Sequence, residues 1–267
     1  MSASASSRPL ALVTGASSGI GLELAKQFAT NGFDLIVAAE DSELASATRE
    51  LEGLGAGLES VQVDLASEGG VEELWRTVAG AGRPLDAAAL NAGIGAGGSF
   101  LDNDLDSELR IVDLNVRSTV KLAKHVVLAM AAHGHGRILF TSSIASTMPG
   151  PYQAVYNASK SFVQSFALAL RGELKDTAIS VTSLMPGPTE TEFFQRAGMQ
   201  DTKLGASEKD DPAEVARMGF EALMDGKERV GAASLSTRLQ GRASRLLPDR
   251  VKAAMHERMA KPGSGQG

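Results

Sequence analysis

Residues 10–21 read LALVTGASSGIG, a short apolar run that leads directly into closely spaced glycines, and a helical pattern of apolar residues begins at Leu22. A strand, a glycine-rich turn and a helix in this order form a phosphate-binding arrangement. The glycines let the backbone approach a pyrophosphate, and the free amides at the start of the helix favour its negative charge. Glycines also serve ordinary strand-to-helix turns, so it is the flanking strand and helix that favour a dinucleotide site here.

Further apolar runs of strand length recur along the chain, separated by amphipathic segments of helix length. They lie at 33–39, 58–63, 85–90, 137–142 and 179–185, with a weaker one at 228–234. Short runs that are apolar on successive residues are typical of parallel strands buried on both faces. Right-handed crossovers then produce a doubly wound sheet. The sequence therefore predicts an α/β fold: a single Rossmann-like, doubly wound parallel sheet of about seven strands with helices on both faces.

The composition narrows the class of protein. The chain has 267 residues, 43% of them hydrophobic, which is enough for one large domain with a buried core. A formal net charge of −6 has the wrong sign for a general nucleic-acid binder, so we expect a small-molecule partner and no nucleic acid. Without cysteine there can be no disulfide or thiol nucleophile, and we expect no metal site. No apolar run is long enough for a membrane span and the opening residues are too polar for a signal peptide, so we expect a cytoplasmic protein.

Three segments set the predicted domain organisation. Residues 1–8 are expected to be a flexible N-terminus and residues 9–233 a single nucleotide-binding domain. Residues 234–267 are expected to be a partly helical basic tail, with seven Lys or Arg against two Asp or Glu. We interpret the tail as a solvated helical appendage, with docking to an acidic surface or a membrane as the alternative. The long connection at 186–211 is predicted to be a lid or a binding loop.

The glycine-rich turn also contains a second pattern. Residues 15–19 spell G-x-S-x-G, the nucleophile elbow of an α/β hydrolase, with Ser17 as the nucleophile. That interpretation requires a downstream acid and then a histidine at the same end of the sheet. The four histidines of the chain fit this requirement poorly. His125 lies in a helical run, His133 and His135 lie in a glycine-rich turn before a strand, and His256 lies in the basic tail. We therefore keep the hydrolase as a minor alternative.

A tyrosine and a lysine form a chemically sensible pair further along the chain. Tyr156 has Lys160 four residues on, so the two side chains share one face of a helix. A phenol is a poor acid or base at neutral pH, and a nearby ammonium group would lower its pKa toward the working range. Ser143 lies 13 residues before Tyr156, at the end of a predicted strand, where a hydroxyl group could bind the same oxygen that Tyr156 protonates.

These patterns occur together and in a fixed order. TGASSGIG, the NAG at 91–93, Asn115 in DLNV, Ser143, the Y-x-x-x-K at 156–160 and the PGPTET that begins at Pro186 follow one another along the chain. In this order and spacing the chain resembles a short-chain dehydrogenase/reductase over roughly Arg8 to Val230. The resemblance implies an NAD(P)-dependent oxidoreductase that transfers hydride between a nicotinamide cofactor and a ketone or aldehyde, or the corresponding secondary alcohol.

The resemblance also implies four catalytic residues. Tyr156 is the general acid or base that gives a proton to the carbonyl oxygen or takes one from the alcohol. Ser143 hydrogen-bonds that oxygen and steadies its developing charge. Lys160 holds the nicotinamide ribose and lowers the pKa of Tyr156. Asn115 holds a water that relays protons to Lys160, and as an ordinary residue it would cap an irregularity in a helix.

The cofactor-binding residues follow from the same resemblance. The glycine-rich turn is expected to hold the pyrophosphate, Asp64 to meet the adenine amino group, Asn91 to lie against the adenosine ribose, and Thr189 and Thr191 to lie near the carboxamide. The full predicted set, together with Tyr156 and Lys160, is Gly15, Ser17, Ser18, Gly19, Ile20, Gly21, Glu40, Asp64, Leu65, Asn91, Ala92, Gly93, Pro186, Gly187, Thr189 and Thr191.

The end of the second predicted strand bears on the choice between NAD(H) and NADP(H). Members of the family that prefer NADP typically have an Arg at the place of Glu40, and those that prefer NAD have an Asp at the place of Ala39; this chain has neither. Glu40 and Asp41 would repel a 2′-phosphate and could accept a hydrogen bond from a ribose hydroxyl. We therefore favour NAD, although acidic residues at the start of the next helix would be explained equally well by exposure to solvent.

The segments expected around the substrate are mainly apolar. They are Gly95 to Phe100, Thr147 to Gln153, and the lid with Phe193, Phe194 and Met199, and they suggest an uncharged or amphiphilic carbonyl or secondary alcohol. Two segments, 112–130 and 154–174, resemble the helices that many family members pair across a dimer. Val155, Phe162, Phe166 and Leu170 are apolar enough to be buried there. We therefore expect a homodimer or a homotetramer.

A protein of another class competes with the enzyme. A sensor or scaffold could keep the fold and bind nucleotide without turnover. Such a protein has no physical need for an activated phenol, so the combination of Ser143, Tyr156, Lys160 and Asn115 favours the enzyme.

Overall fold

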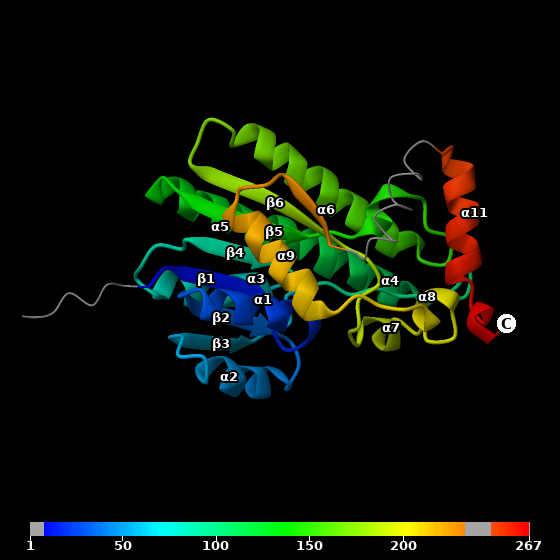
Figure 1. Cartoon of the computed structure of the whole chain (residues 1–267), viewed down its shortest axis with the longest axis horizontal. Coiled ribbons are helices and arrows are strands. Elements are labelled where there is room, and N and C mark those ends of the chain that lie inside the picture. The colour runs from blue at the N-terminus through cyan, green and yellow to red at the C-terminus, as the bar shows by residue number, and fades with distance from the viewer. Residues whose placement is uncertain (1–7, 233–246, 267) are drawn as a thin grey trace, which may run out of the picture.

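A parallel sheet of seven strands forms the centre of the protein in a computed structural model that describes residues 8–232 and 247–266 (Figure 1). The strands lie in the order β3-β2-β1-β4-β5-β6-β7, and every neighbouring pair is parallel. Their bounds are β1 Leu10–Thr14, β2 Asp34–Ala39, β3 Leu58–Gln62, β4 Ala87–Leu90, β5 Gly136–Thr141, β6 Ile179–Pro186 and β7 Arg229–Ala232. The predicted Rossmann-like, doubly wound sheet is confirmed.

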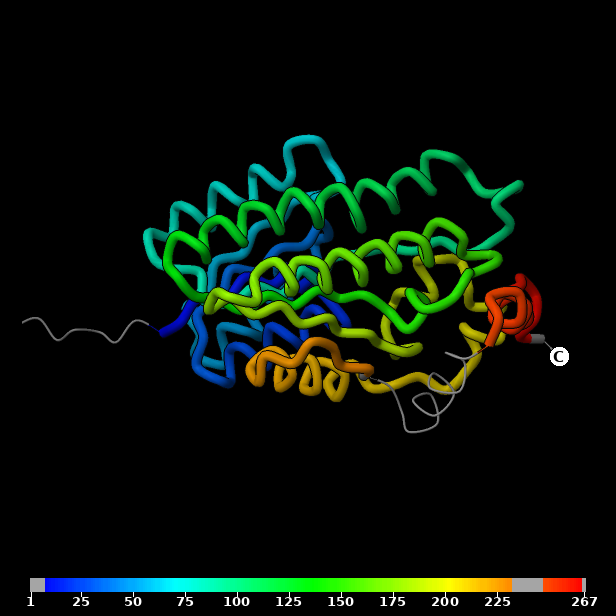
Figure 2. Tube along the Cα trace, turned by 90° about the horizontal axis from the view of Figure 1, so that it is seen from above, coloured from blue at the N-terminus to red at the C-terminus, as the bar shows by residue number. Residues whose placement is uncertain are grey.

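Helices cover both faces of this sheet, and Figure 2 shows α9 on one side with α5 and α6 on the other. One apolar cluster joins the sheet to α1 Gly19–Thr30, α2 Leu44–Glu52 and α9 Pro212–Met224. The other cluster joins it to α3 Gly70–Gly80, α5 Thr119–His133 and α6 Ala154–Glu173. Each face of the sheet therefore has a core of its own, as the successive apolar residues of the strands require.

The edge strand β3 departs from this pattern. Every residue of β1 and β4 is buried, whereas Glu59, Ser60 and Gln62 of β3 are exposed. β3 is an edge strand with one neighbour only, and three of its five side chains reach solvent.

Between α4 Leu105–Val112 and α5 the chain forms a six-residue π-helix, Asp113–Ser118. π-Helical turns are rare and occur mostly at functional sites.

The connection between β6 and α9 carries two short helices, α7 Phe193–Arg196 and α8 Lys203–Ala206. Its two ends are joined, because Thr189 pairs with Asp210 and the backbone N–H of Glu190 donates to the carbonyl oxygen of Asp210 at 2.9 Å. The segment at 186–211 therefore forms a folded loop above the carboxyl ends of the strands, as a lid would.

The described part of the basic tail is not a solvated appendage. Helix α11, Asp249–Ala260, packs against α8, and a short 3-10 helix, Ser264–Gln266, follows it (Figure 1). Its His256 and Ala260 side chains are buried. The prediction of a solvated tail was wrong because it was based on the basic residues of the tail. It did not take into account His256 and Ala260, which face the rest of the protein. Residues 233–246, with Arg238, Arg242 and Arg245, lie outside the described residues.

At the other end of the chain, residues 1–7 of the predicted flexible N-terminus lie outside the described residues. Arg8 is held in place: its Nε donates to the carbonyl oxygen of Gly32 at 3.0 Å and its Nη2 to that of Ala29 at 3.1 Å. Among the described helices, none combines the length and the apolar composition needed to cross a lipid bilayer.

Candidate active site

A cleft with a volume of about 580 Å³ opens at the carboxyl ends of the strands. Strand order reverses there between β1 and β4, which is where doubly wound sheets bind their ligands. The cleft is lined by every residue predicted to bind the cofactor: Gly15, Ser17, Ser18, Gly19, Ile20, Gly21, Glu40, Asp64, Leu65, Asn91, Ala92, Gly93, Tyr156, Lys160, Pro186, Gly187, Thr189 and Thr191. Ser143 also lines it, whereas Asn115 lies behind the wall.

The glycine-rich turn leaves room for a phosphate group against the backbone. Gly15 and Gly19 have φ angles of +67° and +53°, a region that favours glycine. A Cβ atom on Gly21 would lie 1.8 Å from the carbonyl oxygen of Gly15, so only glycine fits there. The first turn of α1 contains no acidic residue to neutralise its free amides. The turn therefore fits the pyrophosphate of a dinucleotide.

Ser17 does not have the partners of a hydrolytic nucleophile. Its hydroxyl donates to Oδ2 of Asp41 at 2.9 Å, and a carboxylate at that position cannot be part of a serine–histidine pair. The imidazole of His125 stacks on Trp75, and that of His135 pairs with Asp86. The hydrolase alternative therefore has no support in the geometry.

The predicted catalytic side chains converge on the cleft from two elements. Ser143 follows β5 and caps the 3-10 helix Ile144–Thr147, with its hydroxyl accepting from the N–H of Ala145 at 3.1 Å. Tyr156 and Lys160 come from successive turns of α6, and both are buried. The Nζ atom of Lys160 lies 5.9 Å from the centre of the Tyr156 ring and donates to the carbonyl oxygen of Thr141 at 3.0 Å.

Burial controls the ionisation of this pair. Burial raises the pKa of Tyr156 to about 12, while its hydrogen bond with Ser143 acts in the opposite direction. Burial lowers the pKa of Lys160 to about 8. The expected lowering of the phenol pKa by the ammonium group is not seen for these atoms, because burial raises the pKa of Tyr156 and the only interaction that lowers it is the hydrogen bond with Ser143. Sequence spacing places the two groups together but says nothing of their burial.

The side chain of Asn115, in the π-helix, binds the backbone of Ile94 at the wall of the cleft. Its Oδ1 accepts from the N–H of Ile94 at 2.9 Å, and its Nδ2 donates to the carbonyl oxygen of Ile94 and to the Ser159 hydroxyl, both at 2.9 Å. A Cβ atom on Gly93 would lie 3.0 Å from Nζ of Lys160 and 3.1 Å from Oδ1 of Asn115. The amide of Asn115 and the amine of Lys160 thus flank the same glycine.

Two residues that sequence reasoning missed hold the Ser143 loop against α6. The Nδ2 atom of Asn157 donates to the carbonyl oxygens of Ala145 and Met148, at 3.2 and 3.3 Å. One turn further on, the Ser161 hydroxyl donates to the carbonyl oxygen of Ser146 at 2.9 Å. Their spacing of four residues is the only signal in the sequence.

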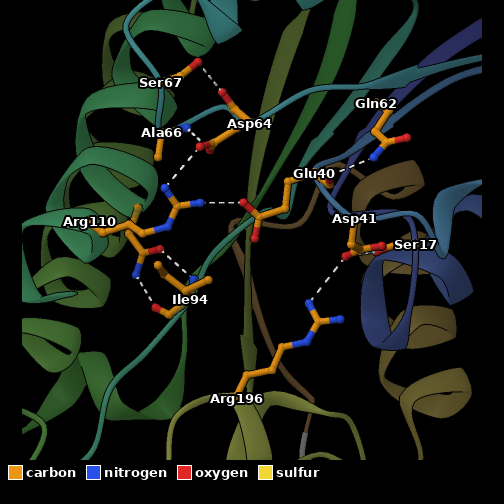
Figure 3. Close-up of polar contacts among 11 residues, drawn as sticks. Ser17, Glu40, Asp41, Gln62, Asp64, Ala66, Ser67, Ile94, Arg110 and Arg196 are labelled. Atoms are coloured by element: carbon orange, nitrogen blue, oxygen red, sulfur yellow. Dashed lines mark hydrogen bonds and ion pairs between the residues drawn. The ribbon is translucent and has the colours of Figure 1, made fainter.

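Two arginines at the end of the cleft that is lined by Glu40, Asp41 and Asp64 were also missed (Figure 3). From α4, Arg110 reaches Glu40 at 2.5 Å and Asp64 at 3.1 Å. From α7 in the lid, Arg196 reaches Asp41 at 3.4 Å. Each contact joins segments that are far apart in the chain, so local pattern could not reveal it.

The opposite end of the cleft is largely apolar. The ring of Phe193 lies 5.1 Å from that of Tyr156, and the other lining residues there are Gly95, Ala96, Met148, Gln153, Phe194, Leu204, His256 and Met259. Much of the predicted wall lies elsewhere: Phe100 is 62% exposed, and Met199, itself a lid residue, is fully buried. Neither lines the cleft, and neither do the predicted wall residues Gly97, Gly98, Ser99, Thr147, Pro149, Gly150, Pro151 and Tyr152.

In residues 8–232 and 247–266, no group of three or more His, Cys, Asp or Glu side chains is arranged to hold a metal ion.

Comparisons with known proteins agree with this architecture. The family model for short chain dehydrogenase matches residues 9–202. An uncharacterized short-chain type dehydrogenase/reductase from Sinorhizobium fredii is 35% identical over 219 residues, which cover 80% of this chain and 85% of that protein. A short-chain dehydrogenase from Sphingobium yanoikuyae, solved with NADPH, is 26% identical with a TM-score of 0.78 and covers 91% of this chain and 99% of its own.

A second solved structure shows the same fold. It is a short-chain dehydrogenase/reductase from Burkholderia phymatum in complex with NAD, 23% identical with a TM-score of 0.80, covering 88% of this chain and 92% of its own.

A doubly wound sheet with a glycine-lined cleft at its switch point is the architecture of a dinucleotide-binding protein. With the family match added, the chain belongs to the short-chain dehydrogenases/reductases, a family of NAD(P)-dependent oxidoreductases.

Proposed function

We propose that this protein transfers hydride between a nicotinamide dinucleotide and a ketone or aldehyde, or the corresponding secondary alcohol, with Tyr156 as the general acid or base. The observation that carries the proposal is the convergence of Ser143, Tyr156 and Lys160 on one cleft that also contains the glycine-rich turn. A bound dinucleotide supplies or accepts the hydride.

The chain's own residues handle the oxygen and its proton. The raised pKa keeps the proton on Tyr156 near neutral pH, and this is the form that donates to a carbonyl oxygen during reduction. The Ser143 hydroxyl donates to the same oxygen as negative charge develops on it. Lys160 is assigned to the ribose. Asn115 lies beside it at Gly93, with both Nδ2 hydrogens engaged, so the water that relays a proton to the amine is assigned to the remaining lone pair of its Oδ1.

For the cofactor we propose NAD(H) in preference to NADP(H). Glu40, Asp41 and Asp64 gather at the adenosine end of the cleft, where two arginines balance only part of their charge (Figure 3). A 2′-phosphate would meet net negative charge, whereas a free ribose hydroxyl could donate to a carboxylate. The solved relatives were crystallised with NAD in one case and NADPH in another, which supports a nicotinamide cofactor without choosing between them.

For the substrate we propose an uncharged or amphiphilic carbonyl compound or secondary alcohol. The supporting observation is the apolar lining beyond Tyr156, formed chiefly by Phe193, Phe194 and Met148.

The test is to mix the protein with NADH or NADPH and a panel of ketones, and to follow the loss of cofactor absorbance for the wild type and for Tyr156→Phe. We expect the variant to lose roughly a hundredfold or more in kcat/KM, because it lacks the transferable proton. Its affinity for the cofactor and its thermal unfolding midpoint serve as controls and should stay close to those of the wild type.

Three results would contradict the proposal. Full activity in Tyr156→Phe would exclude the phenol as the acid. Tight dinucleotide binding without any turnover would favour a sensor. Ester cleavage that depends on Ser17 would favour the hydrolase.

A further inference from the structure

The end of the chain forms one wall of the cleft together with the lid. The N–H groups of Gly263 and Gly265 donate to Asp201, to its Oδ2 at 2.7 Å and to its carbonyl oxygen at 2.8 Å. The N–H of Lys203 donates to the Ser264 hydroxyl at 3.0 Å. Ala260 is buried in one apolar cluster with residues of the lid. Helix α11 is therefore fixed to the lid, and both lie beyond the carboxyl ends of the strands (Figures 1 and 2).

His256 brings a polar group into this apolar wall. Its side chain lines the cleft and is only 4% exposed. The other residues that line this end of the cleft include Met148, Phe193, Phe194, Leu204 and Met259. An imidazole buried among such side chains needs hydrogen-bond partners for both of its nitrogens.

One ring nitrogen has its partner. Nδ1 of His256 lies 3.1 Å from the carbonyl oxygen of Pro151. A carbonyl oxygen can only accept, so Nδ1 carries the hydrogen. Burial lowers the pKa of His256, which favours the neutral ring. In a neutral imidazole with a hydrogen on Nδ1, the other nitrogen is an acceptor.

That second nitrogen, Nε2, makes no hydrogen bond within the part of the chain that the structure describes. Because Pro151 occupies the Nδ1 edge and the residue lines the cleft, a molecule in the cleft is the natural partner for Nε2. The partner must supply a hydrogen, since Nε2 has only a lone pair to offer.

We propose that His256 is a substrate-binding residue that accepts a hydrogen bond from a hydroxyl or amine group, and that the substrate is a carbonyl compound with an apolar body and such a donor group remote from the reacting carbon. This inference rests on the proposed function, because it takes the occupant of the cleft to be the carbonyl substrate. It adds a recognition site outside the catalytic residues.

The first test compares matched ketones. A homologous series of straight-chain methyl ketones is assayed, each paired with the ketone of equal length that ends in a hydroxyl group. At the chain length that spans the distance to α11, we expect the wild type to favour the hydroxylated member by roughly three- to tenfold in kcat/KM, the size of one net hydrogen bond. The difference should lie mainly in KM, because the contact is remote from the reacting carbon. A wild type without preference at any length would overturn the proposal.

Two substitutions separate the recognition role from a structural one. In His256→Asn the side-chain amide can still donate to the carbonyl oxygen of Pro151 but offers nothing at the position of Nε2. In His256→Gln the longer amide reaches the position of Nε2 and gives up the contact with Pro151. We expect the preference for the hydroxylated ketone to disappear in the Asn variant and to survive in part in the Gln variant. His133→Asn, at an exposed histidine, is the matched control and should leave the preference unchanged.

An equal loss of kcat/KM for both members of the pair in His256→Asn would show that the residue only supports the wall, and the proposal would be wrong.

A binding measurement keeps this proposal separate from the proposed function. The ring nitrogens of isotope-labelled histidine are followed by NMR in the full chain, with the His256 signals assigned by their loss in His256→Asn. We expect the hydrogen on Nδ1, and a shift of Nε2 on addition of the hydroxylated ketone with oxidised cofactor, which cannot reduce the ketone. A hydrogen on Nε2 would overturn the inference. If no ketone were reduced but Nε2 still shifted, the proposed reaction would fail and the binding site would stand.

Discussion

Lys160 places an ammonium group in a nearly solvent-free position at the centre of the site. Its side chain is 6% exposed, and its Nζ donates to the carbonyl oxygen of Thr141. No carboxylate contributes to its shifted pKa, which burial alone brings down to about 8. A charged lysine held in this way costs stability.

The stability of the protein should therefore depend on pH through Lys160. The unfolded chain keeps this proton up to the ordinary lysine pKa of 10.5, whereas the folded chain releases it from about 8. The unfolded state thus binds more protons between these values, so the free energy of unfolding rises with pH in that window. Relative to Lys160→Met, the wild type should gain roughly 2 kcal/mol between pH 8 and pH 10, as measured by urea unfolding of both proteins.

The ionisation of Tyr156 sets the highest pH at which the effect of Lys160 on stability can be measured. Its raised pKa means that the unfolded chain loses the phenolic proton first, from the ordinary value of 10.0, so stability falls above that pH. Parallel curves for the wild type and Lys160→Met below pH 10 would show that burial does not control the lysine.

At the level of elements, α4 closes the adenosine end of the cleft by bridging the ends of β2 and β3 (Figure 3). The guanidinium group of Arg110 donates a hydrogen bond to Oε2 of Glu40. The other carboxylate oxygen of Glu40, Oε1, makes no hydrogen bond within the described residues. The side chains of Arg110 and Glu40 are 43% and 39% exposed, so their ion pair adds little to stability. We infer that the contact orients Glu40 toward the ribose.

Arg110→Gln should therefore weaken NADH binding by roughly three- to tenfold, the loss of one well-placed hydrogen bond, with little change in the thermal unfolding midpoint. Isothermal titration with NADH measures the effect. In a Glu40→Gln background the same substitution should have almost no further effect if Arg110 acts through Glu40, whereas a remaining loss would assign the effect to its other partner, Asp64. Arg117→Gln, on the neighbouring π-helix and 68% exposed, is the matched control. A selective loss of NADPH binding in Arg110→Gln would show instead that the guanidinium group binds a phosphate.

Local sequence patterns predicted the elements better than the contacts between them. Each of the seven strands lies within two residues of its predicted position over the described residues. For the central strands the reason is that burial on both faces leaves a continuous apolar run. The residues predicted to bind the cofactor line one cleft. The glycines and the Tyr–Lys pair could be named from local sequence patterns, whereas the other predicted residues came from the resemblance to a known family. By contrast, the two lid helices are four residues long each, too short to show a period. The burial of α11 depends on contacts across the whole chain.

Apolar side chains on the surface of the whole molecule bear on the predicted oligomer. Helices α4, α5 and α6 leave apolar side chains exposed at Leu109, Val112, Val120, Leu128 and Phe162. Of the residues expected at the interface, Phe166 and Leu170 instead pack against the core of their own chain. We propose a homodimer, or a tetramer built from it, that covers the side chains which remain exposed.

Light scattering at micromolar concentration should show a mass of two or four chains. Phe162→Glu places a charge where we expect the helices of two copies to meet, so it should shift the mass toward a monomer while the thermal unfolding midpoint changes little. Phe162 is 40% exposed, which lets the charge reach water once the copies separate. A monomeric wild type would contradict the proposal.

The attachment of α11 to the lid has a consequence for how this enzyme could diversify. The family model ends at residue 202, and the helix that carries His256 lies wholly beyond it. The residues proposed for proton transfer and dinucleotide binding are therefore encoded in one stretch of the gene, and the part of the far wall that α11 supplies in another. Exchange of the last segment alone could redirect the enzyme to new compounds, while the chemistry of the reacting carbon stays as it is.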